Sequence, residues 1–365
     1  MFDAHWYGDI YANAVLILTL LAAIQLSQNK NNGFSPIANW SLAIMMTLFI
    51  GTRPISGVFW DTVNYAFSFE RAAKGLEAGY TDEGFNWLME TSAQFVNVET
   101  FFVICAAIYV VPLAMGMQKI HGRWSYIATL CLIGAGSFMP YATNGIRNGM
   151  ATSLVILGFA CYRQKLFMIL FFLLAYSMHK SVLLPIACFL IAGIWANPRT
   201  YVSIWMLCLF ATIVGGSVIA SQVTALTPAN EEDMRLADYV SMGSAGKYGG
   251  FRWDFILNAI LPVIVSRHLA VKNALQDKFY QRLLCTYLAA NAYWVLVMQV
   301  GFSNRFAYLS WFMTAWVVIY PHLPPKDSRL MGEENWANRC GFLLLFNYIT
   351  ACYSFYLMNT FSKFF

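Results

Sequence analysis

Charged residues are scarce in this chain of 365 residues. Asp, Glu, Lys and Arg make up 11% of it, whereas a soluble domain carries about 25%. Hydrophobic residues reach 59% and the mean hydropathy is +0.54. The composition therefore excludes an ordinary soluble domain and predicts an all-α, polytopic integral membrane protein.

The sequence also lacks the cysteine patterns of disulfide scaffolds and metal sites. Its 8 cysteines form no C-x-x-C pair, and all but Cys340 lie inside apolar runs. We interpret them as small apolar residues, and no metal or cofactor is expected. The first nine residues contain no Lys or Arg, so they are not expected to be a signal peptide, which begins with a basic segment.

Apolar runs fill most of the chain and predict about 12 transmembrane helices in a single transmembrane domain over residues 1–365. The runs lie at 10–26, 37–52, 100–117, 126–139, 148–162, 166–178, 182–196, 202–220, 255–265, 283–300, 306–321 and 341–358.

The loop charges predict an orientation, because cytoplasmic loops of membrane proteins are rich in Lys and Arg. With both termini outside, the inner loops hold 13 of the 23 basic residues and only four of the 18 acids. The net charge of +5 is then an orientation signal, and nucleic acid is not an expected partner. The two long outer segments, at about 53–99 and 222–254, place the expected activity on the outer face.

The run from 166 to 194 is interrupted by His179 and Lys180. It is long for one crossing and short for two. If it crossed once, the basic loop 267–282 would move outside, so we predict two short helices that meet at 177–181. Charge inside a membrane is expensive and usually functional, although Lys180 snorkelling beside a tight helix turn is the structural alternative.

Basic residues collect on the predicted outer face, where the orientation rule disfavours them. Arg53, Arg147, Lys180 and Arg305 each lie at the end of a predicted helix. Arginine forks two N–H donors onto phosphate oxygens, and helix N-termini add partial positive charge. Together with His179 these residues predict a diphosphate site. For any single arginine, a lipid headgroup contact or an ion pair is the structural alternative.

Two acids beside aromatic residues suggest sugar binding. Asp61 stands in Trp60-Asp61-Thr62-Val63-Asn64-Tyr65, after which we expect a helix near 62–77. Glu83 stands in Asp82-Glu83-Gly84-Phe85-Asn86, which begins another predicted helix. A solvated loop with salt bridges to Arg71 and Lys74 is the structural alternative.

The ordered set of motifs resembles the EpsG/Wzy-like family of bacterial polysaccharide polymerases over residues 40–310. The motifs are Gly51-Thr52-Arg53 with Asp61 and Tyr65, Glu83-Gly84-Phe85, Asn144-Gly145-Ile146-Arg147-Asn148-Gly149-Met150-Ala151, His179-Lys180-Ser181, and Asn304-Arg305-Phe306-Ala307-Tyr308.

The resemblance implies transfer of a glycan from undecaprenyl diphosphate onto a second lipid-linked repeat unit, at the outer face of the bacterial cytoplasmic membrane. His179 is then the expected base, with Asp61 and Glu83 as rivals. The transfer is expected to be inverting and metal-independent. The residues expected to bind the diphosphate or the substrate are Arg53, Tyr65, Asn144, Arg147, Lys180, Asn304, Arg305 and Tyr308.

The expected partners are undecaprenyl-diphosphate-linked oligosaccharides and membrane lipid, with a chain-length regulator protein as a further candidate. Two alternatives stay open. One is a glycosyltransferase that uses a polyprenyl-monophosphate sugar, and the other is a flippase for lipid-linked oligosaccharides. A flippase needs charges along a path through both leaflets, whereas the charges singled out here gather on one predicted face.

Overall fold

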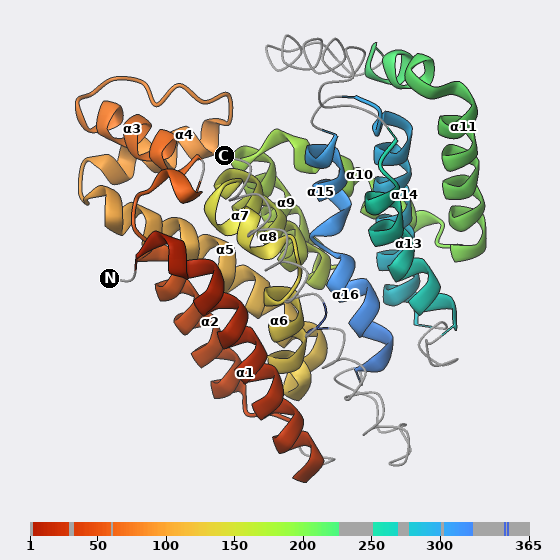
Figure 1. Cartoon of the computed structure of the whole chain (residues 1–365), viewed down its shortest axis with the longest axis horizontal. Coiled ribbons are helices and arrows are strands. Elements are labelled where there is room, and N and C mark those ends of the chain that lie inside the picture. The colour runs from red at the N-terminus through yellow and green to blue at the C-terminus, as the bar shows by residue number, and fades with distance from the viewer. Residues whose placement is uncertain are drawn as a thin grey trace. The chain divides into compact units, whose positions relative to one another are not determined.

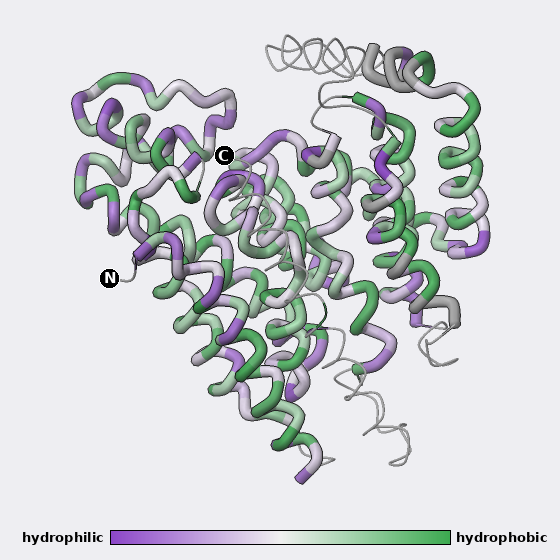
Figure 2. Tube along the Cα trace, viewed as in Figure 1, coloured by the Kyte–Doolittle hydropathy of each residue, from purple (hydrophilic) through white to green (hydrophobic). Residues whose placement is uncertain are grey.

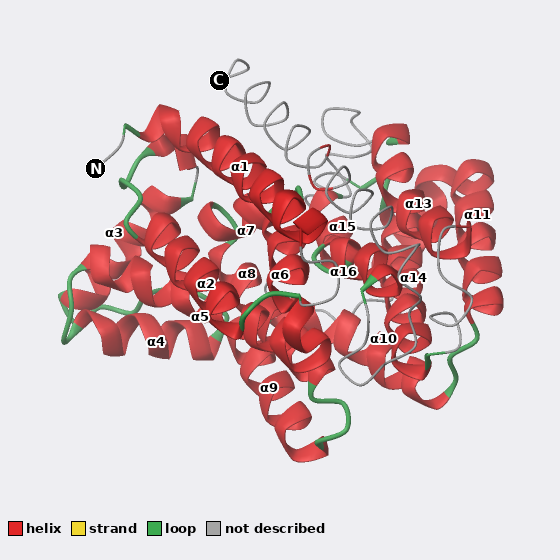
Figure 3. Cartoon of the chain, turned by 90° about the horizontal axis from the view of Figure 1, so that it is seen from below, coloured by secondary structure: helices red, strands yellow, loops and turns green. Residues whose placement is uncertain are grey.

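The computed structural model describes residues 3–28, 33–59, 61–225, 251–268, 277–300, 303–323, 347 and 349. All regular elements in these ranges are helices, as Figure 3 shows, so the predicted all-α class is confirmed for this part of the chain. The chain divides into two compact units, Met1–Leu183 with His322–Phe365, and Leu184–Pro321. Each unit is described by itself.

The first unit is built around α5 (Val98–His121), which packs against α2 (Pro36–Gly51), α6 (Ser125–Ile133) and α8 (Ile146–Ala160). Helix α1 (Tyr7–Gln28) packs against α6. The buried Asn39 amide joins three helices, because it donates to the Ala114 carbonyl at 3.3 Å and accepts from Thr129 Oγ1 at 2.7 Å. Buried polar groups need such partners.

Helices α3 (Thr62–Ala73) and α4 (Glu83–Ala93) lie together where α2 ends and α5 begins (Figure 1). They fill the predicted outer segment 53–99, and the helix expected near residues 62–77 is confirmed. Both are amphipathic: Figure 2 shows hydrophilic and hydrophobic residues mixed along them. Their buried faces hold Tyr65, Phe69, Phe85 and Met89. The rings of Tyr65 and Phe85 pack against each other, and Phe69 and Phe85 pack against Phe101 of α5.

The 166–194 run is interrupted at His179, as predicted. Helix α9 (Lys165–Met178) ends there, His179 is extended with φ −162° and ψ 117°, and the 3-10 turn η4 (Lys180–Val182) leads into α10 (Leu183–Ile194). Helix α9 packs against α8 and α4. The extended residue turns the His179 and Lys180 backbone away from the helix axis.

The second unit is organised by α14 (Lys278–Val297), which packs against α11 (Pro198–Ala225), α15 (Asn304–Trp311) and α16 (Thr314–Ile319). Helix α13 (Trp253–His268) packs against α16. Buried Asn291 of α14 links α11 to α15, because it accepts from Trp205 Nε1 at 2.7 Å and donates to Ser310 Oγ at 2.9 Å. Most of the predicted outer segment 222–254 lies outside the described residues.

In the described part, three helices are long and apolar enough to cross a membrane: Ala4–Gln28, Val98–Ile133 and Pro198–Gly216. Shorter apolar helices include α2, α8 and α9. Two predicted runs are not single helices. Run 126–139 is divided between α6 and α7 (Phe138–Thr143), and run 306–321 between α15 and α16. The first division falls at Gly134-Ala135-Gly136-Ser137, where two glycines weaken a helix. The number of crossings, about 12, stays a prediction.

Candidate active site

A fully buried carboxylate, Asp82, connects three helix ends in the first unit. Its Oδ2 pairs with Arg147 Nη1 and lies 3.1 Å from His179 Nδ1. Its Oδ1 accepts the backbone N–H of Lys180 at 3.1 Å. Asp82 is 0% exposed, whereas the side chains of Arg147 and His179 are 18% and 19% exposed. The arrangement leaves the two basic side chains at the surface of the cluster and the acid beneath them.

The local sequence directs Asp82 towards its partners. Asp82 occupies the N-cap position of α4 in an extended conformation, but its side chain makes no capping hydrogen bond to α4. The carboxylate turns instead to α8 and to the end of α9. Gly84 permits this close approach, because a Cβ at this position would stand 2.7 Å from Ser177 Cβ and 2.9 Å from the Ser177 carbonyl oxygen.

Arg147 lies in the first turn of α8 and is enclosed by aromatic rings. Its guanidinium stands 4.6 Å from the centroid of the Tyr80 ring and 6.0 Å from that of the Phe85 ring. Cation–π contacts of this kind hold a guanidinium in place. Its buried Nε has no hydrogen-bond partner among the described residues. The guanidinium is therefore fixed on one side and still has donor capacity.

Electrostatics keep Asp82 ionised. Burial alone would raise its pKa, but the hydrogen bond and charge of His179, the charge of Arg147 and the Lys180 N–H outweigh burial and hold the pKa below its usual value. Burial raises the pKa of Tyr65 to about 12, so its phenol is neutral at neutral pH and its oxygen can accept from Arg147. The cluster thus contains one buried anion that is paired with Arg147 and hydrogen-bonded by His179 and the backbone N–H of Lys180.

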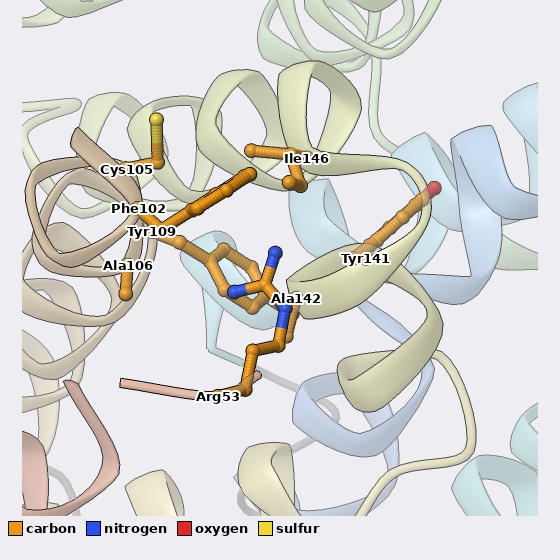
Figure 4. Close-up of a pocket in the computed structure, with 8 residues that line it drawn as sticks. All are labelled: Arg53, Phe102, Cys105, Ala106, Tyr109, Tyr141, Ala142 and Ile146. Carbon is orange, nitrogen blue, oxygen red and sulfur yellow. The ribbon is translucent and has the colours of Figure 1, made fainter. Parts of the chain in front are cut away.

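Arg53 is buried in the same unit but has different partners. Its Nη1 donates to the Ile50 carbonyl at 2.8 Å and its Nη2 to Thr62 Oγ1 at 3.3 Å. The guanidinium stands 4.8 Å from the Phe102 ring centroid, within the small pocket shown in Figure 4. Burial lowers its pKa to about 10, so it stays charged at neutral pH. These contacts lie within the protein and hold the end of α2 against α3.

Two hydrogen bonds connect the start of α3 to the turn between α7 and α8. Thr62 Oγ1 donates to the Thr143 carbonyl at 2.9 Å, and Asn144 Oδ1 accepts the Asp61 N–H at 3.3 Å. The Asp61 carboxylate is exposed and accepts from Asn64 Nδ2 at 3.2 Å. Glu83 is also exposed, at the start of α4. Neither candidate base has a described contact with His179.

Arg305, Tyr308 and Asn304 belong to α15 of the second unit. Arg305 is exposed, and Tyr308 packs edge-on against Trp311. The Asn304 side chain lies outside the described part. The side chains of Arg147 and His179 and the backbone N–H of Lys180 meet at Asp82. The convergence of the α15 residues with them, and the role of all these residues as a substrate site, stay predictions.

Comparison with known proteins identifies the family. A family model described as the EpsG family matches residues 40–365. The chain belongs to the EpsG family. Membership and the apolar helices together indicate a membrane-embedded protein of the polysaccharide-polymerase type. No curated protein matches the chain, and no solved structure matches it.

Asp82 of this EpsG-family protein is the site residue that the sequence interpretation missed. The helical period could have revealed it. Asp82 precedes Phe85 by three residues and Met89 by seven, and both side chains are 0% exposed, so Asp82 shares their buried face. Glu83 is one position further round the helix and exposed. The spacing thus marks Asp82 as buried, whereas the prediction from the sequence named the neighbouring Glu83.

Proposed function

We propose that this EpsG-family protein polymerises polysaccharide at the outer face of the bacterial cytoplasmic membrane. It transfers a glycan from undecaprenyl diphosphate onto the non-reducing sugar of a second lipid-linked repeat unit. One observation supports this most: Arg147 and His179, 32 positions apart in the sequence, meet on a single buried carboxylate. A phosphate-binding cation and a proton acceptor side by side are what such a transfer needs.

His179 serves as the base in this proposal. As the acceptor hydroxyl oxygen forms its bond to the anomeric carbon, the hydroxyl proton moves to His179. The bond from that carbon to the phosphate oxygen breaks, and its electron pair leaves on undecaprenyl diphosphate. Displacement in a single step inverts the anomeric configuration.

Arg147 and Lys180 stabilise the leaving group. Negative charge develops on the diphosphate as it departs, and preorganised cations aimed at it are worth several kcal/mol. The Arg147 guanidinium is held by Tyr80 and Asp82 before substrate arrives. No carboxylate of the described residues pairs with Lys180. Arg305 of the second unit is proposed separately as a ligand of the diphosphate.

The test measures polymer length in cells that lack the native gene and carry single variants. His179→Ala, Arg147→Ala and Arg305→Ala should each replace the ladder of polymer bands by a single repeat unit. Arg163→Ala is the matched control, since Arg163 is an exposed arginine beyond the opposite end of α8 from Arg147 and its ladder should persist. Membrane levels of every variant are measured alongside. Full ladders from well-expressed His179 and Arg147 variants would refute the proposal.

Purified protein in liposomes separates this function from its alternatives. We expect linkage formation with an undecaprenyl-diphosphate donor and none with a polyprenyl-monophosphate sugar. Product NMR should show inverted configuration at the new linkage, and retained configuration would contradict the single displacement. A flippase variant would instead trap single repeat units on the inner face, where an impermeant label cannot reach them.

A further inference from the structure

We infer that Asp82 is the positioning residue that fixes the tautomer of His179 and directs its Nε2 to the acceptor hydroxyl. The inference deepens the proposed function and rests on it. Asp82 itself does not touch substrate, because it is fully buried beneath Arg147 and His179. It acts through the imidazole.

Hydrogen-bond geometry fixes the tautomer. An ionised carboxylate can only accept hydrogen bonds, so the ring nitrogen that faces it, Nδ1 at 3.1 Å from Oδ2, must carry the proton. Whenever the ring is neutral, Nε2 therefore holds the free lone pair. No described residue hydrogen-bonds to Nε2, and the side chain is 19% exposed. A substrate hydroxyl can therefore approach the nitrogen that is able to accept its proton.

The same carboxylate stabilises the product of proton transfer. When Nε2 takes the acceptor proton, the ring becomes an imidazolium with Asp82 on its other side. The hydroxyl oxygen keeps its electron pair for the bond to the anomeric carbon, and the lipid diphosphate leaves with the pair from the broken bond. Asp82 stays ionised throughout, because Arg147 and the Lys180 N–H share its two oxygens.

A purely structural role explains the geometry less well. An aspartate at an N-cap usually accepts from the N–H groups of its own helix, and Asp82 makes no such bond. Both oxygens serve the residues of the proposed site instead. A buried ion pair is also weak evidence for stability, since well-packed apolar residues often stabilise a protein as much or more.

A double-mutant cycle tests the inference, with purified protein in liposomes and radiolabelled lipid-linked repeat units. Asp82→Asn keeps the shape of the side chain, but its amide can donate to Nδ1 and so favour the wrong tautomer. We expect it to lower kcat on the order of 10²–10³-fold, with the acceptor KM little changed. In a His179→Gln background the same substitution should lower kcat less than about threefold, because there is no imidazole left to orient. Glu70→Gln, an exposed carboxylate on α3, is the matched control.

If Asp82→Asn lowers kcat by the same factor in wild-type and in His179→Gln protein, the inference is overturned and Asp82 is a structural residue. If Asp82→Asn does not accumulate in the membrane, the cycle is run with Arg147→Gln present, so that the two removed charges balance. Asp82→Asn should then lower kcat in Arg147→Gln protein and have little effect in Arg147→Gln/His179→Gln protein. Failure of the proposed function gives a different result, because wild-type protein would then form no linkage from a diphosphate donor.

Discussion

Replacement of Gly84 by alanine should separate Asp82 from His179 without touching either residue. A Cβ at Gly84 would lie 2.7 Å from Ser177 Cβ, while ordinary contact begins at 3.4 Å. The start of α4 must therefore move away from α9 by at least about 0.7 Å. Such a shift can stretch the 3.1 Å contact between Asp82 and His179 beyond hydrogen-bond range. We expect a loss of about 1–3 kcal/mol of stability from overpacking and a fall of about 10²-fold in turnover from misplacement.

The assay compares kcat and thermal stability with a matched glycine. A Cβ added at Gly57 would have no neighbouring atom within 4 Å, so Gly57→Ala should leave kcat unchanged. Combining Gly84→Ala with Ser177→Gly removes the nearest obstructing atoms and should restore part of the lost activity. If Gly84→Ala protein has normal turnover and normal stability, α4 and α9 do not approach as closely as described, and the link from Gly84 to the Asp82–His179 contact is wrong.

Three further outcomes follow from the same contacts. Arg53→Gln should lower the unfolding temperature and membrane level, because it deprives the Ile50 carbonyl and Thr62 Oγ1 of buried donors at a cost of about 1–3 kcal/mol; a stable variant with only a raised donor KM would instead indicate diphosphate binding. Lys180→Gln should keep the unfolding temperature and raise the donor KM about tenfold, and an unchanged KM would remove Lys180 from the proposed site. For Asp82 the folded pKa is depressed, so its stabilising effect is present above the unfolded pKa and lost as the pH falls through the folded one. The difference in unfolding temperature between wild type and Asp82→Asn should shrink as the pH falls below about 4, and a difference that already shrinks as the pH falls from 7 to 5 would contradict the depressed pKa.

Apolar runs predicted the helices well where a run was uninterrupted. The runs at 37–52 and 148–162 correspond to α2 and α8. The break at His179 followed from the length of its run and from the loop charges. Helix ends inside apolar sequence were not foreseen, because α6 and α7 are separated by a few small, uncharged residues that did not interrupt the apolar run.

The candidate site was predicted in part for a related reason. Charged residues at the ends of apolar runs can be read from the sequence, so Arg147, His179 and Lys180 were predicted together. Which acid they meet depends on tertiary packing. The sequence led us to predict Glu83 and Asp61, which are both exposed to solvent. In the structure it is Asp82 whose carboxylate is buried between helices. The burial of Asp82 depends on the close approach of α4 to α9 at Gly84. These two helices are far apart in the chain, so their contact could not be read from the sequence.

The buried Asp82–Arg147–His179 cluster is consistent with the proposed role in glycan transfer. Removing Asp82 and its partners from water costs several kcal/mol per ion, and their mutual attraction offsets this only with good geometry. Apolar packing of Phe85 against Phe101 also joins α4 to α5, so the ion cluster is not the only contact that holds α4 among the described residues. Its consequence is an imidazole and a guanidinium whose positions are fixed before substrate binds. Fixed positions reduce the reorganisation that a transfer between two lipid-linked sugars would otherwise require.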